Sequence, residues 1–140
     1  MLGGIAAAGA AGVVAATVWR RDRFAGAAMT PPQAWAAVRA GDLLLIDIRR
    51  PDEWARTGAP DGATRLDMRR TDFVAALDDL TGGDRTRPVA LICARGVRSD
   101  RTSARLRDAG FTRVVDVPEG MLGSSAGPGW LARGLPVERP

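Results

Sequence analysis

The chain has 140 residues, 46% of them hydrophobic, which suits one folded domain with a real core. One cysteine and no histidine exclude an intrachain disulfide, a Cys/His zinc site and any catalytic triad built on histidine, and we expect neither a metal nor a cofactor. The net charge is +4, and all 20 basic residues are arginines spread along the chain, so we expect no nucleic-acid-binding stripe but a small anionic substrate.

The first part of the chain is apolar. Residues 2–19 carry no charge and are followed by Arg20, Arg21 and Arg23, so residues 1–24 are expected to form a hydrophobic segment with a basic flank. Its length is barely enough to span a bilayer. The positive-inside rule predicts a membrane anchor with the domain on the cytoplasmic side. The alternatives are a signal that exports the domain to the periplasm and a tail on a soluble cytoplasmic protein.

From Thr30 onward, short apolar runs alternate with helical patterns. Thr30 is a candidate helix N-cap, and Gly41 marks a helix end. In chain order we expect a helix over 30–41, a strand over 43–48, a turn over 59–63, a short strand over 64–68, a helix over 71–80, a strand over 89–93, a helix over 99–110, a strand over 112–117 and a short helix over 129–134. This alternation predicts an α/β domain over residues 29–140, with a parallel sheet covered on both faces.

Two chemically interesting residues close apolar strands. Asp47 and Cys93 fall at carboxyl ends, where open parallel sheets bind their ligands. After Cys93 the chain reads ARGVRS, so a glycine and two arginines precede a candidate helix start at Ser99. A helix N-terminus and nearby guanidinium groups favour a reactive thiolate, and the glycine allows successive N–H groups to face an anion. The alternative is that Cys93 is a small buried packing residue.

These residues resemble the rhodanese-like sulfurtransferases. The stretch CARGVRS, residues 93–99, is similar to that family's C-x-x-G-x-R-S loop. Residues 43–68 are similar to its Asp-x-Arg and G-x-I-x-G-A segment, and EGMLG with GWLARGLPV to its C-terminal signature. The resemblance implies a single rhodanese-like domain with a central, mostly parallel five-stranded sheet flanked by helices.

The resemblance also implies an activity and its residues. Cys93 would take a sulfane sulfur from a small anionic donor such as thiosulfate and, as a persulfide, pass it to a thiol, a protein or cyanide. The backbone of Ala94, Arg95, Gly96, Val97, Arg98 and Ser99 would hold the persulfide, with Arg98 and Arg95 binding the donor. Two departures stand out. Ala59 replaces a histidine, and residues 122–130 look like an insertion that could reshape the pocket mouth and the choice of acceptor.

Asp47 and Arg49 match the family's Asp-x-Arg and admit two interpretations. Asp47 could lie near the pocket and tune the loop arginines, or the two could belong to a structural ion pair in which Arg49 faces Glu53. A phosphatase is a weaker alternative, because related phosphatase loops hold one more residue between the cysteine and the arginine. The other alternative is a membrane-tethered binding or sulfur-relay module, associated with the membrane through residues 2–19.

Overall fold

The computed structural model describes residues 28–140. The predicted hydrophobic segment 1–24 lies outside the described residues. Within the described part, no helix has the length and apolar character needed to cross a membrane.

The central sheet is parallel throughout and has the order β3-β1-β4-β5. Its strands are β1 (Leu44–Asp47), β3 (Thr64–Arg65), β4 (Val89–Ile92) and β5 (Val114–Asp116). The expected fifth strand is reduced to one parallel bridge from Ala28 to Asp116, with the Met29 N–H donating to the Asp116 carbonyl at 2.9 Å. Pairing stops there because the Thr30 N–H donates to Gln33 Oε1 at the start of α2, and Pro31 and Pro32 have no N–H.

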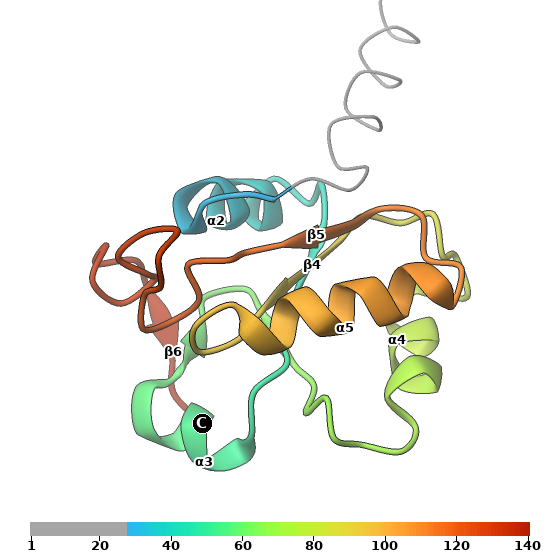
Figure 1. Ribbon diagram of the computed structural model, residues 1–140, viewed down its shortest axis with the longest axis horizontal. Coiled ribbons are helices and arrows are strands. Elements are labelled where there is room, and N and C mark those ends of the chain that lie inside the picture. The colour runs from blue at the N-terminus through green and yellow to red at the C-terminus, as the bar shows by residue number, and fades with distance from the viewer. Residues whose placement is uncertain (1–27) are drawn as a thin grey trace, which may run out of the picture.

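Helices cover both faces of the sheet (Figure 1). Helix α2 (Pro31–Arg39) lies on one face, and α4 (Phe73–Thr81) and α5 (Val97–Asp108) lie on the other. The predicted N-cap of α2 is confirmed: Thr30 Oγ1 accepts from the Gln33 N–H while Gln33 Oε1 accepts from the Thr30 N–H. The expected α/β architecture is therefore present.

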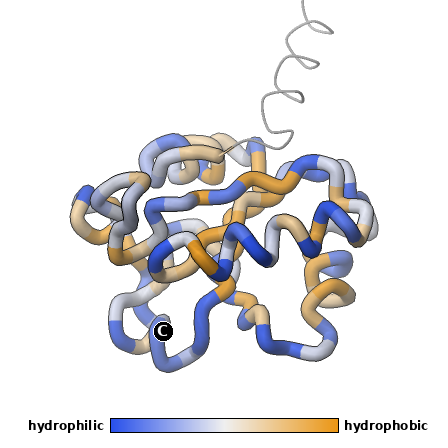
Figure 2. The backbone as a smooth tube through the Cα atoms, in the orientation of Figure 1, coloured by the Kyte–Doolittle hydropathy of each residue, from blue (hydrophilic) through white to orange (hydrophobic). Residues whose placement is uncertain are grey.

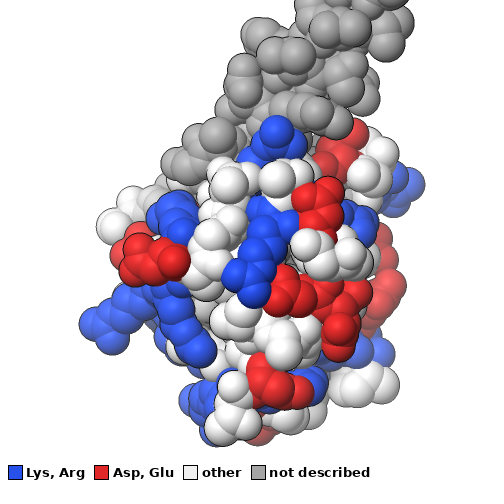
Figure 3. All heavy atoms as spheres, turned by 90° about the vertical axis from the view of Figure 1, so that its right-hand side faces the viewer, with Lys and Arg blue, Asp and Glu red and all other residues white. Residues whose placement is uncertain are grey.

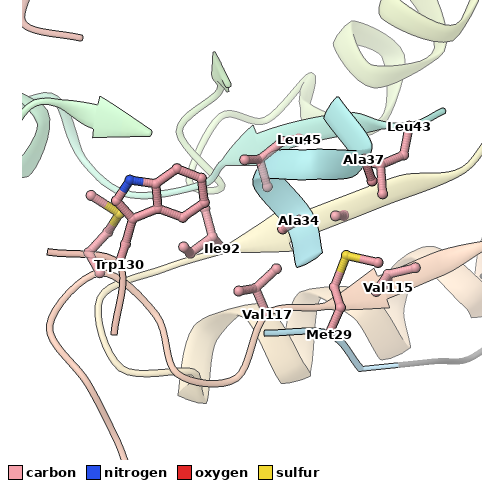
Figure 4. Close-up of a cluster of buried hydrophobic side chains, with 11 residues drawn as sticks. Met29, Ala34, Ala37, Leu43, Leu45, Ile92, Val115, Val117 and Trp130 are labelled. Atoms are coloured by element: carbon pink, nitrogen blue, oxygen red, sulfur yellow. The ribbon is translucent and has the colours of Figure 1, made fainter. Parts of the chain in front are cut away.

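Two apolar cores separate the sheet from its helices. Strand residues alternate between them because successive side chains point to opposite faces. Figure 4 shows the core under α2, where Trp130 is fully buried beside Leu45 and Ile92. The second core, beneath α4 and α5, includes Cys93 together with Leu91, Phe73, Leu77 and Leu106. Figure 2 shows hydrophobic stretches on the inner strands, while α4 and α5 carry both hydrophobic and hydrophilic stretches. On the face seen in Figure 3, acidic and basic side chains are interspersed rather than gathered by sign.

The structure corrects several predicted boundaries. Helix α5 begins at Val97, two residues before the expected start, because Gly96 with φ 87° takes the N-cap position. Helix α4 begins at Phe73 after Asp72, later than the predicted start at residue 71. Residues 129–134 form turns instead of a short helix: Gly129 and Gly134 both have positive φ.

The sequence analysis did not predict one helix and one pair of short strands. Helix α3 (Pro51–Thr57) follows β1 and begins with a proline at its first position. The expected turn after it contains β2 (Ala59–Pro60), which pairs antiparallel with β6 (Val137–Glu138). This pairing joins residues that are far apart in the chain, so no local sequence pattern predicts it.

Candidate active site

The sulfur of Cys93 lies at the N-terminus of α5. It accepts hydrogen bonds from the N–H groups of Gly96 at 3.1 Å and Ser99 at 3.4 Å. The thiol in turn lies 3.5 Å from Ser99 Oγ, which donates to the Gly96 carbonyl at 3.1 Å. The backbone donors and the helix dipole favour negative charge on this sulfur. Ser99 thus contributes through its backbone N–H and its hydroxyl, and is not the N-cap that its position suggested.

Close backbone packing fixes the loop around the sulfur. Gly96 has φ 87°, and a Cβ there would stand 2.3 Å from the Pro118 carbonyl oxygen. Gly120 fills the same role from the other side, since its Cβ would stand 2.4 Å from the Ala94 carbonyl oxygen. The N–H groups of Met121 and Leu122 donate to the carbonyls of Cys93 and Ala94, both at 2.9 Å. The loop therefore rests on residues 118–122 and has little freedom to change shape.

Arg98 is held by a carboxylate from α3. Its Nη1 and Nη2 donate to the two oxygens of Glu53 at 2.8 and 2.7 Å. The guanidinium of Arg98 is the main cause that lowers the pKa of Glu53 to about 2. The hydrogen bonds and the charge of Glu53 raise the pKa of Arg98. The arginine expected to face the donor is thus already neutralised by a partner that the sequence analysis did not assign to it.

Asp47 and Arg49 form a buried structural pair, with side chains 0% and 1% exposed. Arg49 Nη2 donates to Asp47 Oδ2 at 2.8 Å and to the Gly58 carbonyl at 2.8 Å, and Nη1 donates to Thr57 Oγ1 at 3.0 Å. The expectation that Arg49 faces Glu53 is wrong, because Arg49 folds back onto β1 and the end of α3. By tying α3 to β1, this pair positions Glu53 for Arg98.

The other loop residues point away from the sulfur or to the surface. Arg95 Nη1 donates to the Gly123 carbonyl at 3.2 Å, and Val97 is 59% exposed. Cys93 itself is only 1% exposed, so the loop encloses its sulfur tightly. Of the six predicted substrate-binding residues, the structure places the N–H groups of Gly96 and Ser99 on the sulfur.

The segment 122–130, noted in the sequence as a departure, is held in shape by a second buried carboxylate. Glu119 accepts from the Gly129 N–H at 2.9 Å and from Arg133 at 2.7 Å through each of two guanidinium nitrogens. The Ser124 hydroxyl donates to the Pro118 carbonyl at 2.7 Å, beside Gly96. This segment is therefore a structured wall next to the cysteine loop. Glu53 and Glu119 were both missed as site-building residues, because their partners lie on other parts of the chain.

The arrangement of a cysteine at a strand end, a glycine-built loop and a helix N-terminus matches a known family. A sequence profile described as the rhodanese-like domain matches residues 30–126. The chain belongs to this family. The expected rhodanese-like fold is thereby confirmed.

Several relatives of this rhodanese-like domain are called sulfurtransferases. The protein called thiosulfate sulfurtransferase GlpE from Glaesserella parasuis is 33% identical over 110 residues, which cover 79% of this chain and 91% of that protein. A protein called sulfurtransferase from Allochromatium vinosum is 31% identical over 99 residues, 71% of this chain and 81% of that protein. Among solved structures, the polysulfide-sulfur transferase homodimer of Wolinella succinogenes aligns with a TM-score of 0.64 at 26% identity, over 92% of this chain and 89% of that one.

Proposed function

We propose that this chain is a sulfurtransferase of the thiosulfate type in which Cys93 carries the transferred sulfur. The observation that supports the proposal most directly is the sulfur of Cys93 at the start of α5, with the Gly96 and Ser99 N–H groups donating to it. A persulfide needs the same kind of cradle, because its outer sulfur is also anionic. The named relatives support the same chemistry.

The reaction has two steps, and its atoms balance without an external base. The Cys93 thiolate attacks the outer sulfur of a donor such as thiosulfate, the donor's S–S bond breaks, and sulfite leaves with the bonding electron pair. The acceptor, a thiolate or cyanide, then attacks the outer sulfur of the persulfide and returns Cys93 to the thiolate. Covalent catalysis of this kind replaces one difficult transfer with two easier ones and needs no histidine.

The proposal assigns the donor to the arginine side of the loop. The Arg98 guanidinium, although paired with Glu53, is 31% exposed and keeps donors for an anion. Arg95 is also exposed, but its Nη1 donates to the Gly123 carbonyl on another side of the loop. An incoming dianion would compete with Glu53 for Arg98, so this ion pair would tune donor affinity.

The test is the intact mass of the full chain after thiosulfate and then cyanide. We expect a gain of one sulfur atom that cyanide removes with release of thiocyanate, and no gain in a Cys93→Ser variant. The burial of Cys93 favours one competing function, a binding or relay module without turnover. A Cys93 that takes up no sulfur and resists small alkylating agents would establish that alternative and overturn the proposal.

A further inference from the structure

Glu53, the carboxylate that occupies Arg98, is itself fixed by the start of α3. Its Oε2 accepts from Arg98 Nη1 at 2.8 Å and from the N–H of Arg50, the N-cap residue of α3, at 3.0 Å. The carboxylate is 12% exposed and the guanidinium 31%. When an anion takes Arg98, the more exposed side chain moves and leaves Glu53 without its counter-charge. This loss costs free energy, because a poorly solvated charge needs a partner.

A second guanidinium stands beside the same carboxylate. Arg50 Nε lies 3.9 Å from Glu53 Oε2, too far for a hydrogen bond but close enough for a rotamer change to bring the two into contact. Arg50 is bound to Asp52 instead, through Nε at 2.9 Å and Nη2 at 3.0 Å. These hydrogen bonds and the charge of Asp52, followed by the charge of Glu53, raise the pKa of Arg50. Arg50 is therefore already within the field of Glu53.

Asp52 can release Arg50 because it has another partner. Arg56, one turn further along α3, donates from Nη2 to Asp52 Oδ2 at 2.9 Å. The side chains of Arg50 and Asp52 are 41% and 51% exposed, so both can turn with little obstruction. The three arginines and two carboxylates thus form a row of ion pairs. A shift by one partner along this row keeps Glu53 and Asp52 paired while Arg98 becomes free.

From this row we infer that Arg50 is a positioning residue for the anionic sulfur donor, because it moves onto Glu53 when Arg98 turns to the donor. The inference rests on the proposed sulfur transfer and names what makes Arg98 available to an anion. Arg50 does not contact the donor and acts only through Glu53. Its effect is therefore expected on the half of the reaction that uses the donor, and not on the half that uses the acceptor.

The described surface holds a matched control for Arg50. Arg70 makes the same kind of pair with the acid two residues on, donating to Asp72 through Nε at 2.8 Å and Nη2 at 2.7 Å. The side chains of this pair are 50% and 57% exposed, and within residues 28–140 Arg70 forms no salt bridge with another carboxylate. Arg70→Gln therefore removes the same charge and the same local pair as Arg50→Gln, without touching Glu53.

Steady-state kinetics with thiosulfate and cyanide test this role, because in a two-step transfer kcat/KM for each substrate reports its own step. Arg50→Gln should lower kcat/KM for thiosulfate about fivefold, the size of one screened charge contact at 4 Å, and leave kcat/KM for cyanide within about twofold. Arg50→Lys keeps the charge and should restore most of the loss. Arg70→Gln should change both values by less than about twofold.

A double variant removes the group through which Arg50 acts. Glu53→Gln leaves Arg98 without a charged competitor, so kcat/KM for thiosulfate should rise, and adding Arg50→Gln should then change it by less than about twofold. A fivefold loss that persists in the Glu53→Gln background would show that Arg50 attracts the donor directly and would overturn the inference. No rise in Glu53→Gln, a wild-type value in Arg50→Gln, or an equal loss in Arg70→Gln would overturn it too.

A binding measurement separates this inference from the proposed function. Sulfate has the charge of thiosulfate and no sulfur to transfer. In an NMR titration of the full chain at constant ionic strength, it should shift the amide signals of Arg98 and Ser99, with a Kd about fivefold higher in Arg50→Gln and within about twofold of wild type in Arg70→Gln. A wild type that takes up no sulfur but shows this pattern would refute only the sulfur transfer. Absence of these shifts, or equal weakening in both variants, would overturn the role of Arg50 even if sulfur transfer proceeds.

Discussion

The ion pair between Glu53 and Arg98 ties the cysteine loop to α3, and a double-mutant cycle should measure it. We consider Glu53→Gln, Arg98→Met and the double variant. Gln keeps an acceptor for the Arg50 N–H, which Glu53 Oε2 accepts at 3.0 Å, so the helix start survives and the charge is lost. Two bonds of 2.7 and 2.8 Å join side chains that are 12% and 31% exposed. After allowance for solvent screening, we expect a coupling free energy of about 1–2 kcal/mol at pH 7.

The coupling should also depend on pH in a defined direction. The folded-state pKa of Glu53 is lowered from 4.5 to about 2, so its stabilisation is complete above pH 4.5 and is lost as the pH falls toward 2. Urea unfolding of the four proteins at several pH values between 7 and 3 gives the coupling at each. A coupling below about 0.3 kcal/mol at pH 7 would refute the reasoning, because surface pairs that contribute little fall in that range. A coupling that stays constant down to pH 3 would refute the assigned pKa.

Two further predictions concern the backbone and the buried charge pair. Gly96→Ala should lower the free energy of unfolding by at least about 3 kcal/mol and abolish sulfur uptake, because the new Cβ meets a backbone carbonyl at positive φ. Gly41→Ala has a similar φ of 73° and open space around it, and should cost only about 1 kcal/mol in the same urea unfolding; equal losses would contradict the role of the close contact. Arg49→Met should cost about 3–5 kcal/mol in urea unfolding, since it leaves a buried carboxylate without its counter-charge. Arg56→Met breaks a pair whose side chains are 70% and 51% exposed and should change unfolding little; a comparable loss there would show that burial is not the cause.

The sequence predicted well those features that depend on neighbouring residues. Local patterns predicted all four strands of the central sheet, with only the strand over 64–68 clearly longer than the observed β3, and the capping of α2 at Thr30 also follows from a local pattern. The order of residues after Cys93 indicated a loop leading into a helix. Each of these features is decided within a few residues, where spacing and conformational preference are strong signals.

Features that depend on distant residues were missed or misassigned. Glu53 lies 45 positions from Arg98, and nothing in either segment identifies the other as its partner. Arg49 was expected to face Glu53 because both lie in one segment, but the shorter path back to Asp47 satisfies it within the core. Likewise, no local pattern predicts that Asp116 Oδ1 is buried without a hydrogen-bond partner among the described residues, because this follows from the packing of β5 against α5.

The segment between Gly120 and Trp130 forms a loop whose two ends lie next to each other. The Trp130 N–H donates to the Gly120 carbonyl at 2.9 Å and the Leu131 N–H to the Met121 carbonyl at 3.2 Å, so the two ends of the excursion are stapled side by side. Lengthening a loop with fixed ends costs little conformational entropy. The domain can therefore exchange this stretch during evolution, or in the laboratory, for one of different length and chemistry while the cysteine cradle keeps its shape. Changes in this loop are therefore a way to adapt the same domain to different sulfur acceptors.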